Sequence, residues 1–320
     1  MKKSKNSRTF APKKSPVKNF TRGQGSKGAS PVKKEVAFDK NNSGAFDTRP
    51  FSTGKDKSQS GFKDLEAKGP REPKLAFPKA WRHVAGTHAI MELINKRPAS
   101  VQSILIQNNW KSSAELRELV DIATKKKIKL EEKPEAALFP LCHSHQGAIA
   151  FSNENLEFSF ENKTWDDHGL IVALDGVEDP HNLGAVLRTG WLMGVDGVMI
   201  PDDRAVGLTA TVHKVACGGA EHVPIYRNNQ FQKPFETLKE AGFWVYGLDH
   251  KAEKTIYDIK FPEKVILVLG AEDKGIRTTT EKVCDELICI PQSSAGASYN
   301  VSVSAALAIA EVKRQWSLKK

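Results

Sequence analysis

The 320-residue sequence predicts an α/β protein whose last domain, residues 168–320, contains a parallel sheet with helices on both faces. Two observations support this prediction. Apolar runs rich in β-branched residues alternate along the domain with segments of helical periodicity, which is the order expected of strand–helix–strand units. The apolar runs also lack polar–apolar alternation, which is typical of strands that are buried on both faces.

The individual elements of the last domain follow from the same pattern. We expect strands at six apolar runs, which are residues 169–177, 195–201, 222–226, 243–248, 264–270 and 286–291. The helical spacing of apolar residues predicts four helices, at residues 182–194, 208–217, 234–242 and 301–316. Ligands of parallel sheets bind at the carboxyl ends of the strands, so functional residues are expected in the segments that follow these runs.

A smaller α/β domain is expected before it, at residues 76–153. Its expected elements are a helix after Gly86, a strand at 101–107, a helix at 113–128 and a strand at 145–151. Ser112 or Ser113 is the expected N-cap of the second helix, because a serine hydroxyl accepts a bond from a free amide of the first turn. The polar segment at 154–167 is interpreted as a linker to the last domain.

Residues 1–75 differ from the rest of the chain in charge. They contain 19 Lys and Arg against 7 Asp and Glu, a net charge of +12, whereas the remaining residues carry 29 against 31. The segment has no Ile, Trp, Tyr or Cys, so it buries too little apolar area to offset its ordering entropy, and we expect a disordered basic tail. Lysines interleaved with phenylalanines favour contact with RNA or DNA, and a solvated linker is the alternative. A G-x-G-x-x-G at residues 23–28 has no strand before it and no helix after it, so no dinucleotide site is expected there.

The composition argues against several other classes of protein. No run of eighteen apolar residues is present and no apolar segment follows the basic N-terminus, so neither a transmembrane helix nor a secretory signal is expected. Four cysteines in 320 residues argue against a disulfide-rich scaffold and favour reduced thiols in the cytoplasm. Cys142, His143 and His145 lie close together but lack a fourth ligand at a recognisable spacing, so no metal site is expected. Motifs of P-loop NTPases, zinc metalloproteases and serine hydrolases do not occur.

Three segments that follow expected strands combine polar and small residues. The first reads N-L-G-A-V-L-R, from Asn182 to Arg188, and the second reads L-G-A-E-D-K-G around Glu272. The third joins I-P, at Ile290, to S-Y-N-V-S-V-S, which begins at Ser298 and opens the terminal helix. N-capping accounts for one polar side chain at the start of that helix but not for four of them.

In order and spacing, the three segments resemble the SpoU, or TrmH-type, class of SPOUT RNA 2′-O-ribose methyltransferases. That class carries N-x-G-A-x-x-R, then L-G-x-E-x-x-G, then I-P and, a few residues later, S-L-N-V-S-V-A-x-A. The middle domain, with A-G-T-H-A-I at its start and H-Q-G-A-I-A at its end, is similar to the substrate-binding domain of the class, which is like ribosomal protein L30e. The long basic extension is similar to that of the YfiF branch. The third segment departs from the class pattern, because Gln292 and Ser294 replace the usual Met and Gly and Tyr299 replaces the usual Leu.

The resemblance implies a fold, a cofactor and an assembly. The expected fold is a SPOUT-type trefoil-knotted parallel sheet preceded by the L30e-like domain. S-adenosylmethionine is the implied cofactor, bound in the knot loops by Gly270, Ile290 and Tyr299, largely through backbone groups. The class works as a homodimer whose active site combines residues of both subunits, and its reaction requires no metal.

The resemblance also implies roles for individual side chains. Arg188 is the candidate that handles the ribose 2′-hydroxyl. Because the pKa of a free Arg exceeds ~12, stabilisation of the developing alkoxide is a sounder role for it than proton abstraction. Asn182 would orient Arg188, Glu272 would anchor the site, and Ser298 and Asn300 would place the nucleotide. The implied substrate is tRNA or rRNA, and the alternative is an RNA-binding or ribosome-assembly factor with little or no methyltransferase activity.

Overall fold

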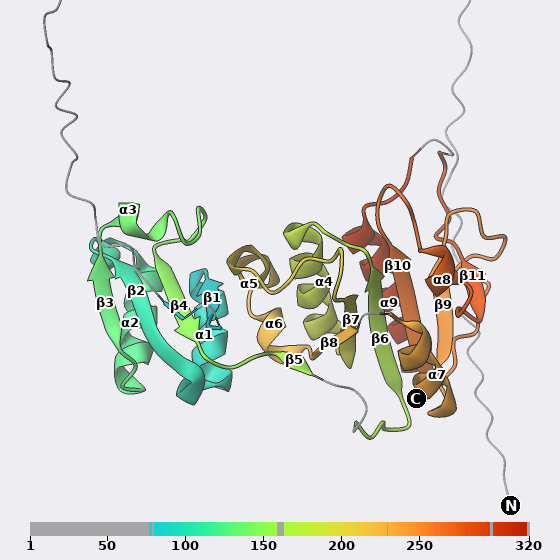
Figure 1. Ribbon diagram of the computed structural model, residues 1–320, viewed down its shortest axis with the longest axis horizontal. Helices are drawn as coiled ribbons and strands as arrows, with labels where there is room; N and C mark the ends of the chain where they lie inside the picture. The colour runs from blue at the N-terminus through green and yellow to red at the C-terminus, as the bar shows by residue number, and fades with distance from the viewer. Residues whose placement is uncertain (1–76, 79, 159–162, 229, 295–296, 319–320) are drawn as a thin grey trace, which may run out of the picture. The chain divides into compact units, whose positions relative to one another are not determined.

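The computed structural model describes residues 77–320 apart from 79, 159–162, 229, 295–296 and 319–320 (Figure 1). The predicted basic tail at 1–75, with its G-x-G-x-x-G, lies outside the described residues. All described residues belong to one compact unit, Arg71–Lys320, and they form a four-stranded and a seven-stranded sheet.

The four-stranded sheet has the strand order β1-β4-β2-β3. Its strands are β1 (Arg82–Ala85), β2 (Val101–Gln107), β3 (Leu130–Lys133) and β4 (Ala148–Ser152). β4 pairs antiparallel with β1 and β2, whereas β2 and β3 are parallel. The sheet therefore confirms the predicted strands at 101–107 and 145–151 and adds two edge strands.

Helices cover both faces of this small sheet. Helices α1 (Thr87–Lys96) and α2 (Ala114–Lys125) pack their apolar residues against Ile104 and Ile106 of β2. The opposite face carries Leu105 of β2, against which the short helix α3 (Glu135–Leu138) packs. Two 3-10 turns, η1 (Pro98–Ser100) and η2 (Trp110–Ser112), precede β2 and α2. Ser113 is the N-cap of α2, as predicted, because its hydroxyl accepts a bond from the Leu116 amide.

The seven-stranded sheet is parallel throughout, in the order β11-β9-β10-β6-β7-β8-β5. Its strands are β5 (Glu157–Phe158), β6 (Gly169–Asp175), β7 (Gly197–Pro201), β8 (Ile225–Asn228), β9 (Trp244–Leu248), β10 (Lys264–Gly270) and β11 (Glu286–Ile288). The six predicted strands all form, with shifted ends. The segment interpreted as a linker contributes β5, which pairs with β8 at the sheet edge.

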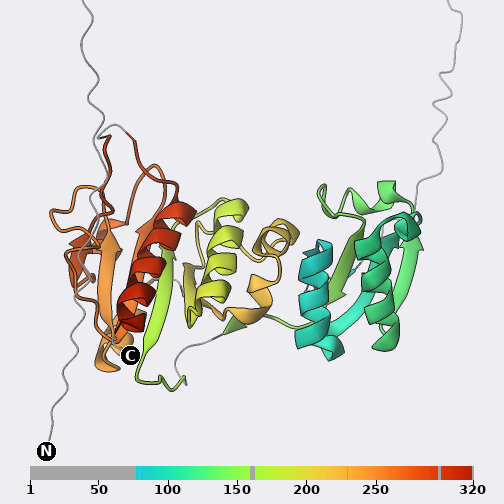
Figure 2. The same cartoon turned by 180° about the vertical axis from the view of Figure 1, so that it is seen from behind.

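Helices lie on both faces of this sheet too, as the sequence predicts. The helices are α4 (Pro180–Met193), α5 (Ala210–Ala216), α6 (Gly219–His222), α7 (Gln232–Glu240), α8 (Thr278–Glu281) and α9 (Val301–Ser317). Residues of α4, α5, α6 and α9 share one buried cluster with the sheet, and residues of α7 belong to a cluster on the other face. Figure 2 shows α4 and α9 on the same face of the sheet, where they pack against each other.

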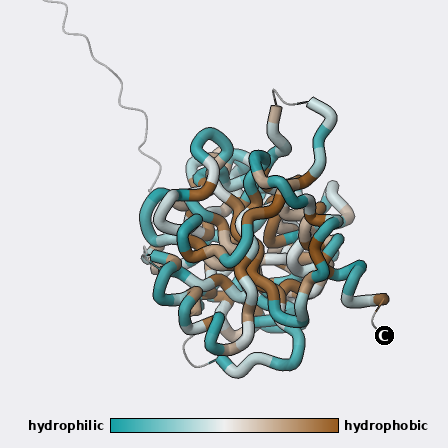
Figure 3. Tube along the Cα trace, turned by 90° about the vertical axis from the view of Figure 1, so that its right-hand side faces the viewer, coloured by the Kyte–Doolittle hydropathy of each residue, from teal (hydrophilic) through white to brown (hydrophobic). Residues whose placement is uncertain are grey.

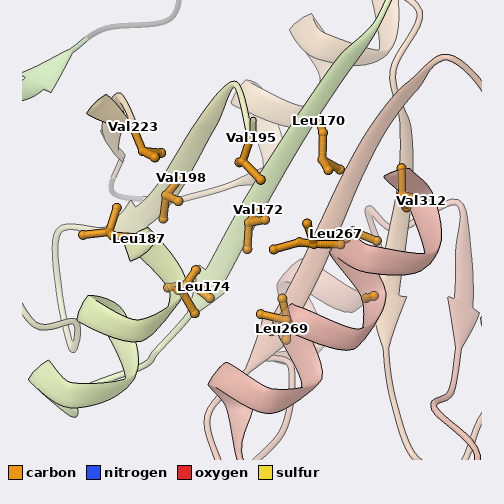
Figure 4. Packing of buried hydrophobic residues seen from close by; sticks show 14 of the residues in the cluster. Leu170, Val172, Leu174, Leu187, Val195, Val198, Val223, Leu267, Leu269 and Val312 are labelled. Atoms are coloured by element: carbon orange, nitrogen blue, oxygen red, sulfur yellow. The ribbon is translucent and has the colours of Figure 1, made fainter. Parts of the chain in front are cut away.

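The central strands show why the sequence lacks polar alternation. Leu170, Val172 and Leu174 of β6 point to the face that α9 covers, where they meet Leu267 and Leu269 of β10 (Figure 4). The intervening residues Ile171 and Ala173 are equally buried in the cluster on the other face. Figure 3 shows hydrophobic residues gathered along the inner strands and hydrophilic residues on the outer loops. Both faces are thus desolvated, which is the condition for parallel strands.

The strand order has a switch point between β6 and β10. From β6 the chain passes outward through β7 to β8, while β10 lies on the other side of β6 and is followed by β9 and β11. In the β6–β10 pair, Asp175 is opposite Gly270, so the loops that follow both strands leave the sheet side by side. Such a point is where ligands of open parallel sheets bind.

The start of α4 differs from the sequence prediction. The helix begins at Pro180 instead of 182, and its N-cap is Asp179, whose carboxylate accepts a bond from the His181 amide at 2.8 Å. Proline is favoured in the first turn because its missing N–H is not needed there. Asn182 therefore lies inside the first turn, and its side chain is not used for capping and is available to other partners.

His213 of α5 is buried, with 1% of its surface exposed, and its Nε2 lies 3.3 Å from Nη1 of Arg82. Burial, and secondly the Arg82 charge, lower the pKa of His213 from 6.5 to about 3. The folded protein thus holds a neutral ring, while the unfolded chain takes up a proton once the pH falls below about 6.5. The stability that depends on the neutral ring is present above pH 6.5 and is lost as the pH falls towards the folded value.

We predict that His213→Gln reduces the pH dependence of stability. One such histidine lowers the free energy of unfolding by about 1.4 kcal/mol between pH 7.5 and pH 5.5. Urea denaturation at the two pH values should show that the variant lacks this part of the wild-type loss. His88→Gln, at an exposed position of α1, is the control and should keep the wild-type dependence. An equal loss in His213→Gln and wild type would contradict the buried neutral ring.

Candidate active site

The polar residues singled out in the sequence meet at the carboxyl edge of β6 and β10. Asn182 comes from the first turn of α4, Glu272 from the loop after β10, and Asn300 from the N-cap of α9. Asn182 Nδ2 donates to Glu272 Oε1 at 2.9 Å, and Asn300 Nδ2 donates to the same oxygen at 2.8 Å. Asn300 Nδ2 also donates to Asn182 Oδ1 at 3.0 Å. Three segments separated by up to 118 residues thus form one hydrogen-bonded triad.

The orientation of this Asn182–Glu272–Asn300 triad is set by the backbone of α9. The Ser302 amide, which can only donate, reaches Asn300 Oδ1 at 2.9 Å. Asn300 must therefore turn its Nδ2 towards Glu272 and Asn182, and Asn182 must accept this bond with its Oδ1. Asn182 is buried, so the triad holds the Glu272 carboxylate in place from a solvent-protected side. Both bonds to Glu272 use Oε1, and neither uses Oε2.

A cavity of about 440 Å³ opens beside the triad. Its lining includes all three predicted cofactor residues, Gly270, Ile290 and Tyr299, together with Glu272 and Ser298. Leu248, Leu269 and Val301 add apolar side chains to the wall. Cavities of several hundred cubic ångströms with apolar walls and a few polar groups are typical of small-molecule and cofactor sites.

Gly270 is required by the shape of the loop that forms one wall of this cavity. Ala271 and Gly275 exchange two backbone hydrogen bonds, of 3.1 and 2.8 Å, which fold the loop back on β10. A Cβ at Gly270 would overlap the backbone of Gly275 and Ile276. The missing side chain at Gly270 therefore lets the 271–275 loop, whose residues line the cavity, pack directly on the end of β10.

Tyr299, the departure from the class pattern, also lines the cavity. Its phenol donates to the Pro291 carbonyl at 3.3 Å, so the side chain connects the segment after β11 to the start of α9. Gln292, the second departure, lines the same cavity. The larger side chain therefore forms part of the wall and leaves the cavity open.

Residues 271–275 also line a second cavity, of about 260 Å³. Asn182 and Glu272 line it, with Asp175 and the cationic side chains of Arg204, Lys274 and Arg277. Asp175, buried at the end of β6, pairs with Arg277 at 2.7 Å and accepts a bond from the Arg277 amide at 2.9 Å. Sequence reasoning missed this pair, although a carboxylate at the end of an apolar strand was a usable signal.

Arg188 does not join the other predicted residues within this chain. It lies six residues after Asn182 on α4, which is about 9 Å along the helix and about 240° around it. Its side chain is exposed, and Arg188 lines neither of the two cavities described. The small residue Gly184, next to Asn182, allows the close approach of a neighbouring helix. A Cβ at Gly184 would meet Val215 Cβ at 2.7 Å, so this glycine admits α5 and not a ligand.

Free cysteines and other potential metal ligands occur in the part of the chain that the structure describes. No group of three or more His, Cys, Asp and Glu side chains in those residues is arranged to hold a metal ion. Burial raises the pKa of the Cys284 thiol to about 12, so this sulfur stays protonated at neutral pH. Among the same residues, no helix has the length and apolar character to cross a membrane.

Most of each sheet lies in a segment that matches a known protein family. The SpoU rRNA methylase family matches residues 169–310, and the RNA 2′-O ribose methyltransferase substrate-binding family matches residues 83–155. The chain is 37% identical to the 23S rRNA (guanosine-2′-O-)-methyltransferase RlmB of Neisseria meningitidis, over 74% of this chain and 97% of that protein. It is 35% identical to RlmB of Escherichia coli K12, over 73% and 98%. The chain belongs to the SpoU family.

Solved structures agree with the fold of this SpoU protein. The SpoU methyltransferase AviRb from Streptomyces viridochromogenes, in complex with AdoMet, superimposes with a TM-score of 0.65 at 20% identity, over 74% of this chain and 91% of that one. A putative RNA methyltransferase of the TrmH family from Porphyromonas gingivalis gives a TM-score of 0.59 at 23% identity, over 74% and 90%. The SPOUT fold is thus confirmed, and the SpoU protein is an S-adenosylmethionine-dependent RNA 2′-O-methyltransferase.

We predict that Gly270→Ala weakens cofactor binding by this SpoU enzyme. The added methyl overlaps the backbone of Gly275, so the loop must shift and displace the groups that line the cavity. Titration calorimetry with S-adenosylmethionine should show an affinity roughly tenfold lower, or weaker still. Gly190→Ala is the control, because a Cβ there meets no atom nearer than 3.4 Å and alanine is favoured in a helix. Equal affinity in wild type and Gly270→Ala would contradict the predicted binding wall.

Proposed function

We propose that this protein methylates the 2′-hydroxyl of a guanosine in 23S ribosomal RNA. The observation that carries the proposal is the intact Asn182–Glu272–Asn300 triad beside the larger cavity. The identity of 35–37% to RlmB relatives over nearly their whole length supports the same class of substrate. A ribosomal RNA substrate also favours a cytoplasmic location.

The proposed chemistry is in-line transfer of a methyl group to the ribose oxygen. When bound, S-adenosylmethionine supplies an electrophilic methyl group on a sulfonium. The protein must therefore position the hydroxyl and stabilise its developing negative charge, because the methyl group is already activated. Gly270, Ile290 and Tyr299 are proposed to hold the cofactor. Ser298, which lines the cavity, and Asn300, which donates to Glu272, are proposed to place the target ribose.

Arg188 is proposed to act in the partner subunit of a homodimer. On α4 its side chain shares a face with Leu192, one turn away, which is 69% exposed. Val303 and Leu307 of α9, also one turn apart, are 45% and 36% exposed. Because α4 and α9 pack together, we propose that these side chains belong to one apolar surface beside Arg188, which a second copy would cover. Such a dimer would bring Arg188 to the partner's triad, where Glu272 Oε2 would accept a bond from the guanidinium.

Two further parts of the proposal rest on family membership, and a third rests on the charge of the basic tail. We propose that the segments after β10 and β11 form a trefoil knot around the cofactor site. The L30e-like sheet is proposed to bind the RNA, and the basic tail is proposed to add sequence-independent affinity through phosphate contacts. The domain limits 1–75, 76–153, 154–167 and 168–320 remain predictions, as does the relation to the YfiF branch.

Loss of the gene should remove one 2′-O-methyl group from ribosomal RNA. Mapping of 2′-O-methyl positions in total RNA, with and without the gene, is expected to lose a single guanosine signal in 23S rRNA. Loss of a tRNA signal instead would identify tRNA as the substrate. If no signal changes and calorimetry detects no cofactor binding at millimolar S-adenosylmethionine, the RNA-binding or assembly factor becomes the better account.

We predict that Arg188→Ala lowers methyl transfer roughly 10²- to 10⁴-fold, the usual range for losing a charge-stabilising group. Cofactor affinity should stay near wild type, because Arg188 lines neither cavity. Arg188→Lys should restore little, since an ammonium cannot make a planar two-pronged contact. The measurement is single-turnover transfer of labelled methyl to unmodified 23S rRNA at saturating cofactor. Lys233→Ala on α7 is the control, and near-wild-type transfer by Arg188→Ala would remove Arg188 from the mechanism.

Mixing two inactive variants tests whether Arg188 acts across the dimer. We predict that Arg188→Ala and Glu272→Ala are each inactive alone, but that refolding or co-expressing them together restores activity. A mixed dimer then holds one complete site, so random pairing should recover about a quarter of the wild-type rate. If Arg188 acted within its own chain, no combination would contain a complete site and the mixture would stay inactive.

A further inference from the structure

A cluster of buried charges outside the active site joins the four-stranded sheet to α5 and α6. Arg82 of β1 donates from Nη1 to Glu221 Oε1 at 2.9 Å and from Nη2 to Oε2 at 3.4 Å. The side chains of Arg82 and Glu221 are 8% and 0% exposed. Both charges are therefore withdrawn from water, and each is neutralised by the other through a two-pronged contact.

The rest of the Arg82 guanidinium is satisfied by groups from both sides. Nε donates to the Glu154 carbonyl at 2.6 Å, and Nη2 lies 3.3 Å from Ser152 Oγ. Nη1 also lies 3.3 Å from Nε2 of His213, whose neutral ring can accept a bond. Each nitrogen of the guanidinium thus has a partner. All of these bonds form together only when the small sheet and helices α5 and α6 are in this one arrangement.

Further contacts nearby reinforce the same junction. Glu92 of α1 bonds to Nε2 of His222 at 2.8 Å, and the His222 ring stacks on Trp191 of α4 with centroids 4.3 Å apart. Gly218, at φ +101°, leaves room for α1, because a Cβ there would overlap the Glu92 side chain. Arg97 adds a second cation to Glu221, with Nε 3.4 Å from Oε2.

The junction is coupled to the helix that bears Asn182 and Arg188. Val215 of α5 lies against Gly184 of α4, and a Cβ at Gly219 of α6 would meet the Leu187 carbonyl at 2.6 Å. The helices that receive Arg82 are therefore packed directly on α4. The small sheet and the catalytic centre are therefore both positioned against α4.

The Arg82–Glu221 ion pair is better suited to fixing the orientation of the small sheet than to stabilising the fold. Desolvation of two charges offsets much of their attraction, so a buried pair adds little net binding. A different docking of the small sheet, however, would leave a buried charge without a partner. Polar contacts between domains ordinarily permit relative motion. A two-pronged buried ion pair forms in only one relative arrangement of its two partners, so it restricts the two domains to that arrangement.

We propose that the Arg82–Glu221 pair is a specificity-determining element for RNA. It fixes the RNA-binding sheet on α5 and α6, so that a structured RNA held by the sheet presents its target ribose at the triad. Arg82 and Glu221 are thus positioning residues that act on the reaction through the placement of the RNA. This inference rests on the proposed function, because it takes RNA as the ligand of both parts of the chain.

The test removes both charges together in the full-length double variant Arg82→Leu/Glu221→Leu, so that neither is left buried alone. The control is Lys254→Leu/Glu286→Leu, which removes an exposed ion pair at the far edge of the seven-stranded sheet. Spin labels introduced as unnatural amino acids at the exposed positions Lys126 and Lys233 report the distance between the two sheets. Labelled chains are diluted with unlabelled chains, so that pairs between subunits contribute little.

We expect a narrow distance distribution for wild type and control and a broad one for the double variant. With structured 23S rRNA, kcat/KM of the double variant should fall roughly tenfold or more, because small misplacement of a reacting group is costly. With a short unstructured RNA that engages only the catalytic half, its rate should match wild type, which general destabilisation would not allow. Cofactor affinity should be unchanged.

Two results would overturn the inference. An unbroadened distance distribution would show that the pair does not fix the sheet, and equal losses on both RNAs would show that it does not act through RNA placement. If the double variant does not fold, Glu92→Ala/His222→Ala, at partly exposed positions, gives the same test with a smaller expected effect. If the wild type transfers no methyl group to any RNA, the proposed function fails, and distance distributions with rRNA affinities still decide the inference.

Discussion

Parallel pairing of β6 with β10 is the constraint on which the rest of this protein depends. The two strands are neighbours in space but 95 positions apart at the Gly169–Lys264 register, and their carboxyl ends finish together at Asp175 and Gly270. The three residues of the triad all lie at this edge of the sheet. The loop after β6 delivers Asn182, the loop after β10 delivers Glu272, and α9 returns over the same strands to deliver Asn300. Packing on both buried faces keeps this pairing fixed, because a one-residue slip would turn every side chain to the opposite face and break its fit with its neighbours.

Hydrogen bonding then turns a shared edge into a defined site. The Ser302 amide determines which way Asn300 faces, and that choice passes to Asn182 and Glu272. A carboxylate held by two amide donors is a fixed acceptor, which suits a reaction that depends on geometry. The exposed positions of α4 and α9 include Arg188 and the apolar side chains Leu192, Val303 and Leu307.

Sequence patterns predicted the parts of the fold and site that depend on local periodicity and spacing. The six strands of the last domain formed because their apolar runs are continuous, and Ser113 caps α2 as its position indicated. β3 escaped prediction because L-E-E-K is a half-exposed edge strand, and β5 escaped because two residues carry no period. The triad residues were named together, although their hydrogen bonds depend on tertiary contacts that spacing does not encode. The same limit hid the Arg82–Glu221 pair, whose members are 139 residues apart.

The two-residue strand β5 changes how the connection between the two sheets behaves. Once Glu157 and Phe158 are paired with β8, only residues 153–156 separate β4 from an anchored point of the larger sheet. Four residues span at most about 14 Å, so the small sheet can sample only a small volume around its docking face. Its effective concentration there is correspondingly high, in the millimolar range typical of short tethers. An interface that would be too weak to hold two separate proteins together is thereby sufficient within one chain.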